Sequence, residues 1–224
     1  PQDHSTARAA TDSLSARPTV AAQKSAIQVL NDTDPTLVTA ARMWHAESQP
    51  MADAARGMTN PDIDRTRPTP EVITAVETLV NTAADAPPVD VPLYRGVILP
   101  EIPEPGGTLS DPLGAWSTNR DVAVMVADMR SGVRDGEMVV LKVEGAKAAP
   151  IAHLARVDEN GSRYKAPHVA AAGEYIASGD YEVVKVQPLI TPVVHPKSIR
   201  EGIYKPDPNT TVRAKLVTVR QRDV

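Results

Sequence analysis

The sequence predicts an α+β fold, with helices in the N-terminal third of the chain and strands after it. Three segments that begin near Thr19, Asp34 and Thr69 space their apolar residues as amphipathic helices do. After Ala86-Pro87-Pro88 the apolar residues occur instead in short runs between turn residues, which is typical of strands. Helices followed by strands, without internal repeats or an evident linker, indicate one α+β domain.

Local signals place the individual elements. Asp34-Pro35 and Thr69-Pro70 each put a capping residue before a proline at the first helical position. A further helix is expected over Asp121–Met129, and the proline-rich residues 188–210 are expected to form an extended connection. A turn is expected at 178–180, and strands at Val91–Leu99, Leu113–Asn119, Met138–Val143, Ile151–Leu154, 169–177, Tyr181–Val186 and Thr211–Val219.

These elements divide the chain into a lead-in and one domain. Residues 1–17 are polar and rich in Ala, Ser and Thr, so we expect a flexible lead-in. Residues 18–224 then form a single domain, with a helical lobe over 18–86 and a β core over 90–224.

The composition excludes several classes of function. The chain has 224 residues, no cysteine and a formal net charge of −4, so neither a disulfide framework nor thiolate chemistry is expected. Without a large basic block, duplex nucleic acid is not an expected partner. No apolar run approaches the roughly 18 residues of a membrane-spanning helix, and no signal peptide is visible. The five histidines are scattered without ligand spacing, so no metal site is expected, and His45 is interpreted as a core or boundary histidine.

Arg95 is the first candidate functional residue. It lies in the apolar run Val91–Leu99, and an arginine stays ionised under essentially all conditions. A buried guanidinium needs an anion, which is either a carboxylate of the chain or a phosphate of a ligand. Arg95 taken alone is more often a structural salt-bridge residue than a ligand-binding one.

Other polar residues near strand ends have ordinary interpretations when each is taken alone. Ser117-Thr118 fits a strand end or a cap of the helix at Asp121, and Glu174 fits a surface carboxylate on a strand. Arg130 and Arg134 fit solvated charges in the loop after that helix.

Taken in order, three short motifs are more informative: Leu93-Tyr94-Arg95-Gly96, then Trp116-Ser117-Thr118-Asn119, then Gly173-Glu174-Tyr175-Ile176. Together they resemble the mono-ADP-ribosyltransferases of the arginine–serine–glutamate class, which include clostridial binary toxins and phage enzymes. The resemblance covers about residues 90 to 187. It implies N-terminal helices packed on a two-sheet mixed β-sandwich, and it implies NAD as the substrate, with no metal.

The resemblance assigns roles to residues of this chain. Glu174 would stabilise the cation that forms on the ribose, as a carboxylate does in glycoside hydrolysis. Arg95 would bind the NAD pyrophosphate, with Glu174 as its counter-ion when NAD is absent. Ser117 would hold Glu174 in position. The other residues implied at the NAD site are Gly96, Trp116, Thr118, Arg130 and Arg134, with Trp116 or Tyr164 as a stacking surface.

One position departs from the family pattern. Many members carry Glu or Gln two residues before the catalytic glutamate, where it engages the acceptor, and this chain has Ala172 there. Another acceptor residue, a group of the preceding loop (Glu159, Tyr164 or His168), or simple NAD hydrolysis would explain the difference. The expected partner is a macromolecular acceptor, most simply a protein. The alternatives are an NAD glycohydrolase and a non-catalytic module of a phage particle or toxin complex, and the chain is expected to be secreted, delivered into a host cell or carried in a virion.

Overall fold

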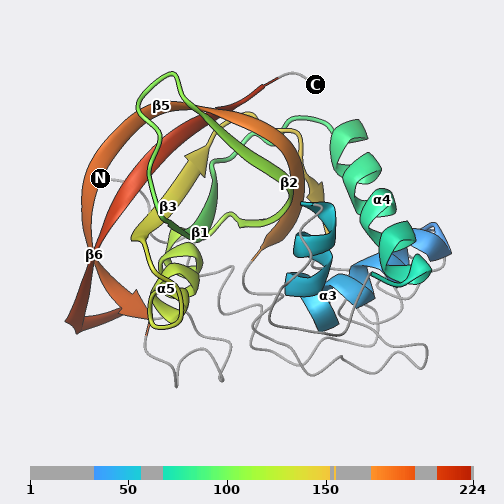
Figure 1. The fold of residues 1–224 in the computed structure, drawn as a ribbon, viewed down its shortest axis with the longest axis horizontal. Helices are drawn as coiled ribbons and strands as arrows, with labels where there is room; N and C mark the ends of the chain where they lie inside the picture. The colour runs from blue at the N-terminus through green and yellow to red at the C-terminus, as the bar shows by residue number, and fades with distance from the viewer. Residues whose placement is uncertain (1–32, 57–67, 152–153, 155–172, 195–205, 223–224) are drawn as a thin grey trace, which may run out of the picture.

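In the computed structural model, two helices pack against one part of a strongly curved sheet and a third helix against another part (Figure 1). The structure describes residues 33–56, 68–151, 154, 173–194 and 206–222. The expected lead-in 1–17 and the expected helix near Thr19 lie outside these residues. The helices are α3 (Pro35–Ala55), α4 (Pro70–Asp85) and α5 (Arg120–Ser131). None of these described helices is long and apolar enough to cross a membrane.

The predicted helix starts are confirmed by their caps. Asp34 Oδ1 accepts a hydrogen bond of 2.8 Å from the backbone N–H of Thr36, and Thr69 Oγ1 accepts one of 3.4 Å from Val72. Each helix has its proline in the first turn, where the missing N–H costs nothing. Helix α5 begins at the expected place, because Asn119 Oδ1 accepts 2.9 Å from the N–H of Asp121.

Six strands form one mixed sheet in the order β2-β1-β3-β6-β5-β4, and β2 also pairs with β5. The five longer strands therefore close into a ring, in which β3 and β6 are parallel and the other neighbours antiparallel. Figure 1 shows β5 and β6 arching over this ring. The strands are β1 (Leu93–Leu99), β2 (Thr108–Ser117), β3 (Glu137–Val143), β4 (Ala149–Pro150), β5 (Glu174–Val194) and β6 (Pro206–Gln221). The predicted α+β class with a mixed sheet is confirmed.

The prediction of a proline-rich connection over 188–210 is wrong where the structure describes it. Strand β5 continues to Val194, and Pro188 and Pro192 face Lys215 and Thr211 of β6. These prolines are tolerated because β2 pairs only with residues 174–182 of β5, so the later part of that edge has no strand partner that needs an N–H within the described part of the chain. The expected turn at 178–180 is likewise inside β5, where Gly179 has a φ of 130°.

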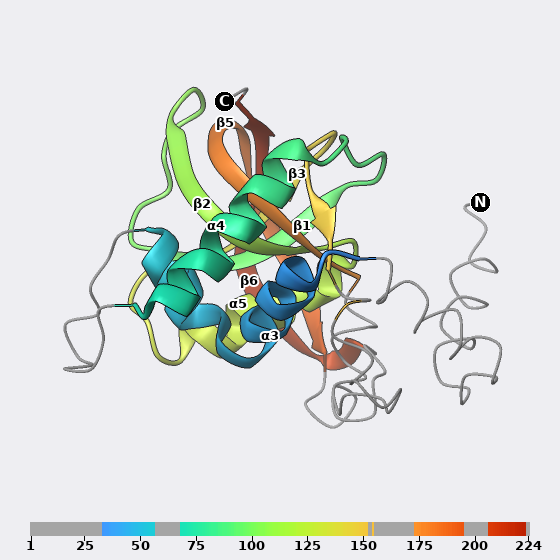
Figure 2. The same ribbon diagram turned by 90° about the vertical axis from the view of Figure 1, so that its right-hand side faces the viewer.

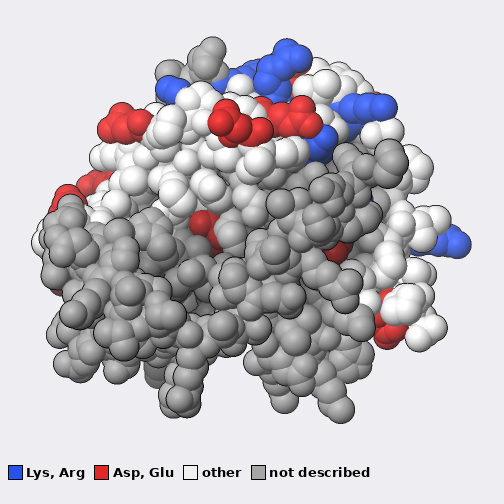
Figure 3. Space-filling view, turned by 180° about the vertical axis from the view of Figure 1, so that it is seen from behind, with Lys and Arg blue, Asp and Glu red and all other residues white. Residues whose placement is uncertain are grey.

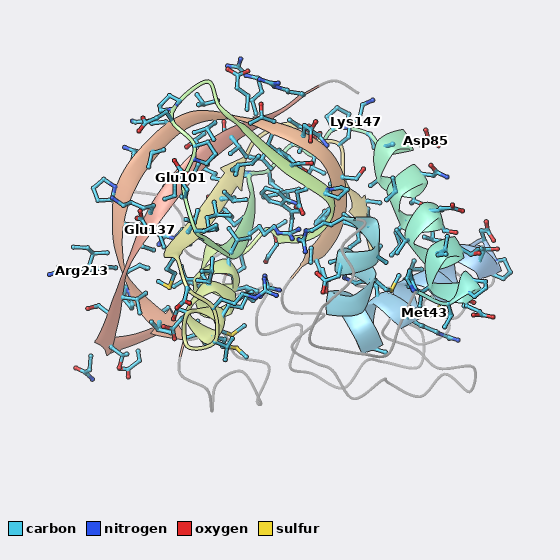
Figure 4. The ribbon with its side chains drawn as sticks, viewed as in Figure 1. Met43, Asp85, Glu101, Glu137, Lys147 and Arg213 are labelled. Atoms are coloured by element: carbon cyan, nitrogen blue, oxygen red, sulfur yellow. The ribbon has the colours of Figure 1, made fainter. Side chains whose placement is uncertain are left out.

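The core has two main parts. One lies between α3, α4 and the outer face of β2 and β5, and includes Trp44, Leu79, Leu113 and Ile176. Figure 2 shows both helices side by side on that face. The other lies inside the ring, where side chains fill the enclosed space, while Arg213 of β6 lies outside it (Figure 4). The surface seen from behind carries basic and acidic side chains close together (Figure 3).

Helix α5 packs on β1 at very short range. A Cβ at Gly96 would lie 1.9 Å from the carbonyl oxygen of Ala123 and 2.7 Å from the backbone nitrogen of Ala127. Only glycine allows the helix to lie this close to the strand. The proposed role of Gly96 at the NAD site therefore has a structural alternative, which is to seat α5.

Candidate functional site

The strand register brings two of the three predicted residues, Ser117 and Glu174, to one level of the sheet. Tyr94 of β1 faces Ser117 of β2, and Ser117 faces Glu174 of β5. Side chains of directly opposed residues have Cβ atoms about 4.5–5.5 Å apart, so Ser117 and Glu174 are close neighbours. Arg95 follows Tyr94. Because side chains alternate along a strand, Arg95 projects from the opposite face of β1 to Tyr94, while Ser117 and Glu174 are neighbours where β2 ends and β5 begins.

Arg95 occupies the gap where β1 and β2 separate. The two strands share only the pair Tyr94 and Ser117. The guanidinium extends toward β2, where a Cβ at Gly114 would lie 1.3 Å from Arg95 Nη1. The register of β2 also shifts between Asp111 and Gly114. The absent side chain of Gly114 thus provides the room in which the guanidinium lies.

The anion that balances Arg95 is Asp111. Arg95 Nη1 lies 2.6 Å from Asp111 Oδ2, as an ion pair without hydrogen-bond geometry, and each residue is only 7% exposed. The expectation that Glu174 is the counter-ion in the absence of NAD is wrong. Asp111 lies before the bulge, outside the strand that the pattern predicts, so no local signal in the sequence marks it.

Further arginines surround this pair. Arg56, which ends α3, lies 3.5 Å from Asp111 Oδ1 and 3.3 Å from Asp53 Oδ1. Arg130 Nη1 donates a hydrogen bond of 3.2 Å to the carbonyl oxygen of Gly96. Its pKa is lowered to about 10, chiefly by burial and then by the positive charges of Arg95, Arg134 and Arg56. The carboxylates thus do not fully offset the arginines here, which favours an anionic ligand.

The expected positions of the two loop arginines are corrected in part. Arg130 belongs to the last turn of α5 and is partly buried, so it is not a solvated loop charge. Arg134 is exposed in the loop after the helix, as expected.

Glu174, the first residue of β5, is held by helix α3. Its Oε1 accepts a hydrogen bond of 2.9 Å from Trp44 Nε1, and its Oε2 lies 3.6 Å from His45 Nδ1. The Glu174 side chain is 16% exposed and the His45 side chain 8%. His45 Nε2 is buried without a hydrogen-bond partner among the described residues. His45 therefore lies at the boundary of the core, with one ring nitrogen facing Glu174.

Ser117 and Thr118 support the turn before Glu174. Ser117 Oγ accepts 2.9 Å from the N–H of Asn119, and the N–H of Thr118 donates 3.4 Å to the carbonyl of Gly173. Gly173 has a φ of 54°, and a Cβ there would lie 2.5 Å from Thr118 Oγ1. Thr118 thus packs against the glycine that turns the chain into β5. A side-chain bond from Ser117 to Glu174 stays a prediction.

Trp116 does not have the predicted role. It is 1% exposed and lies inside the ring, with its centroid 5.3 Å from that of Tyr181. A ring enclosed in the core offers no face to nicotinamide. The predicted loop residues Glu159, Tyr164, His168 and Ala172 lie outside the described residues. Among the residues that are described, no group of three acidic, histidine or cysteine side chains could hold a metal.

The fold matches that of solved ADP-ribosyltransferases. Exoenzyme S from Pseudomonas aeruginosa, in complex with human 14-3-3 protein beta and bound to carba-NAD, superposes with a TM-score of 0.51 and 12% identity, over 95% of this chain and 88% of that one. The ADP-ribosyltransferase Vis, from Vibrio splendidus, gives 0.50 in two complexes. With an inhibitor the identity is 13%, over 92% of this chain and 86% of Vis. With agmatine it is 14%, over 92% and 88%.

At these identities the likeness establishes the fold. No family model and no curated protein matches the sequence. The chain therefore has the mono-ADP-ribosyltransferase fold that the three motifs predicted, and its activity has to be argued from its own residues.

Proposed function

We propose that this chain, folded as an ADP-ribosyltransferase, uses NAD to transfer ADP-ribose to a macromolecular acceptor, most simply a protein. The observation that carries the proposal is that Ser117 and Glu174 are directly opposed on β2 and β5, with Arg95 on the neighbouring β1 one residue from the pair of Tyr94 with Ser117. Ser117 and Glu174 are far apart in sequence, and only the register joins them. A chance resemblance of short motifs would not require these two residues to be opposed.

Glu174 is the proposed catalytic residue. In the reaction, the bond between nicotinamide and ribose C1′ breaks and its electron pair leaves with nicotinamide. The positive charge that develops on the ribose is then stabilised by a nearby carboxylate. Glu174 suits this role because its recorded contacts are an indole and an imidazole, and neither carries a fixed positive charge that would cancel its own. The acceptor bonds to C1′ and releases its proton.

The four arginines around Asp111 (Arg56, Arg95, Arg130 and Arg134) are called the arginine cluster. This cluster is the proposed pyrophosphate site. Arg95 is already paired with Asp111, so Arg130 is the better candidate for direct contact with phosphate. Burial beside other arginines makes its charge unfavourable, and an anion would relieve that cost. Arg95 then contributes to NAD binding in two ways. Its positive charge adds to the electrostatic field of the cluster, and its side chain keeps β1 and β2 apart.

The test follows labelled NAD, with and without cell extracts as the source of acceptor. We expect label on protein with the wild type and its loss with Glu174→Gln, which keeps the size of the side chain. Free ADP-ribose without labelled protein would favour the glycohydrolase. If neither product depends on Glu174, the assignment fails, and the non-catalytic module is favoured.

A separate experiment tests the pyrophosphate site. Arg130→Gln leaves the Arg95–Asp111 pair intact, so a change in NAD binding would not simply reflect misfolding. Loss of a charged hydrogen bond predicts affinity weakened about tenfold or more by calorimetry. Unchanged affinity would exclude Arg130 from the site.

The glycohydrolase is kept as a second candidate because of Ala172, which replaces the acceptor-engaging residue of the family pattern. Agmatine, found in a complex of Vis, is a small guanidine with which to test whether arginine-like acceptors are used. A toxin delivered into a host cell, or a protein of a phage particle, is the proposed biological setting.

A further inference from the structure

Two consecutive residues of helix α3 reach the same carboxylate of β5. Trp44 Nε1 donates to Glu174 Oε1 at 2.9 Å, and His45 Nδ1 lies 3.6 Å from Glu174 Oε2. Neither residue belongs to the three motifs that identify the site. Trp44 is 2% exposed, so its indole is fixed by the core between α3, α4 and the sheet.

The chemistry of the two contacts suits a carboxylate that must stay charged. An indole N–H can only donate, so it orients the oxygen that it contacts without adding a formal charge. An arginine or lysine in its place would orient the carboxylate too, but would cancel the charge that the proposed reaction needs. The indole thus fixes position and preserves charge.

His45 lacks the contacts of a purely structural histidine. Buried polar atoms are normally satisfied, yet Nε2 of this ring has no hydrogen-bond partner among the described residues. The polar contact that the structure gives His45 is the one to Glu174, at ion-pair distance. The imidazole thus has the carboxylate of Glu174 as its polar neighbour.

We propose that Trp44 and His45 are positioning residues that set the Glu174 carboxylate from helix α3. The inference rests on the proposed function, because it is Glu174's role at the ribose that gives its position a catalytic meaning. The packing of helix α3 on the sheet then helps to determine the rate of NAD cleavage.

Kinetics test the positioning role. Trp44→Phe removes the N–H and keeps a large ring, and a carboxylate that is displaced by the loss should slow kcat for NAD cleavage by ~10- to 100-fold. The KM for NAD should change little, because the arginine cluster is untouched. His45→Leu should also lower kcat, and His45→Asn, whose amide nitrogen replaces Nδ1, should restore much of it. Met51→Leu, a volume-conserving change at a buried residue of the same helix, should leave kcat unchanged.

Three results would overturn the proposal. One is a kcat for Trp44→Phe within twofold of the wild type. The second is an additional loss of full size when Trp44→Phe is introduced into Glu174→Gln, because a residue that acts through Glu174 has little left to affect there. The third result is a lowered melting temperature of Trp44→Phe together with a loss of kcat in Met51→Leu as large as that in Trp44→Phe. It would assign Trp44 to packing alone, and would also overturn the proposal.

A measurement without turnover separates this proposal from the proposed function. The chain has two tryptophans, so the ¹⁵N–¹H spectrum shows two indole N–H signals. The signal that disappears in Trp44→Phe should move in Glu174→Gln, and that of Trp116, whose Nε1 is buried without a partner among the described residues, should not. If the Trp44 signal moves in Glu174→Gln but the wild type does not cleave NAD, the proposed function is refuted and the contact between Trp44 and Glu174 stands. If the Trp44 signal does not move, the inference is overturned whatever the turnover.

Discussion

Arg95 and Glu174 lie on strands that both border β2, but the protein holds them in different ways. Arg95 is 7% exposed and paired with the opposite charge of Asp111, within the sheet itself. The side chain of Glu174 is 16% exposed and is held by an indole and an imidazole of helix α3. In a buried ion pair the two opposite charges offset each other, whereas an indole N–H brings no opposing formal charge to the carboxylate that it contacts. We therefore expect the Arg95 side to govern stability and the Glu174 side to govern turnover.

The largest effect on stability is expected from Asp111→Asn. The change leaves the Arg95 guanidinium buried without its counter-ion, which should cost about 3–5 kcal/mol of unfolding free energy in urea denaturation. Glu144→Gln is the matched control. Its ion pair with Lys142 is equally short at 2.6 Å, but the Glu144 side chain is 64% exposed, so ~0.2–1 kcal/mol is expected. Equal losses in the two variants would contradict the role given to burial.

Gly114→Ala is expected to have the next largest effect. Its Cβ would occupy the place of Arg95 Nη1 and displace the guanidinium from Asp111. Overpacking of this kind costs about 1–3 kcal/mol, again measured by denaturation. Gly132→Ala should be almost neutral, because Gly132 caps α5 with a φ of −75° and nothing lies within 4 Å of the added Cβ.

Gly173→Ala tests the turn before Glu174. A side chain at a φ of 54° should cost about 1–2 kcal/mol, in addition to the contact with Thr118. Thr118→Ala in the same chain should relieve the contact but not the backbone strain. A double variant as stable as the wild type would show that the positive φ is not retained.

Glu174→Gln should change stability by only about 1 kcal/mol or less, because the Trp44 N–H keeps an acceptor of the same shape. The expected loss is in NAD cleavage. If this variant were destabilised as strongly as Asp111→Asn, the expected contrast would be refuted, in which Arg95 governs stability and Glu174 governs turnover.

The smallest effect concerns pH. Arg130, with its pKa lowered to about 10, is charged at neutral pH and loses its charge as the pH rises through that value. If it binds pyrophosphate, NAD affinity measured by calorimetry should fall over the same range, by ~1 kcal/mol for one partly exposed charge. In Arg130→Gln this part of the decline should be absent, and an identical decline would exclude Arg130 as its cause.

Much of the fold follows from local patterns. The cap-and-proline pairs Asp34-Pro35 and Thr69-Pro70 place two helices, because capping depends on neighbours within one turn. The apolar run around Arg95 correctly implied a buried guanidinium with an anion. The extent of β5 was not predictable in this way, because a proline in a strand is acceptable or not according to whether its free edge has a partner, which local sequence does not say.

For the site too, some features follow from the sequence and others only from the tertiary structure. The resemblance of three short motifs to the mono-ADP-ribosyltransferases was enough to predict the fold, and it points to Arg95, Ser117 and Glu174 as site residues, which stay a prediction. The partners of the two charges were decided by tertiary structure alone. Trp44 lies 130 residues from Glu174 in sequence, and Asp111 reaches Arg95 only through the bulge before Gly114. Contacts of this kind depend on how helix α3 and strands β1, β2 and β5 pack, and no short-range pattern encodes that geometry.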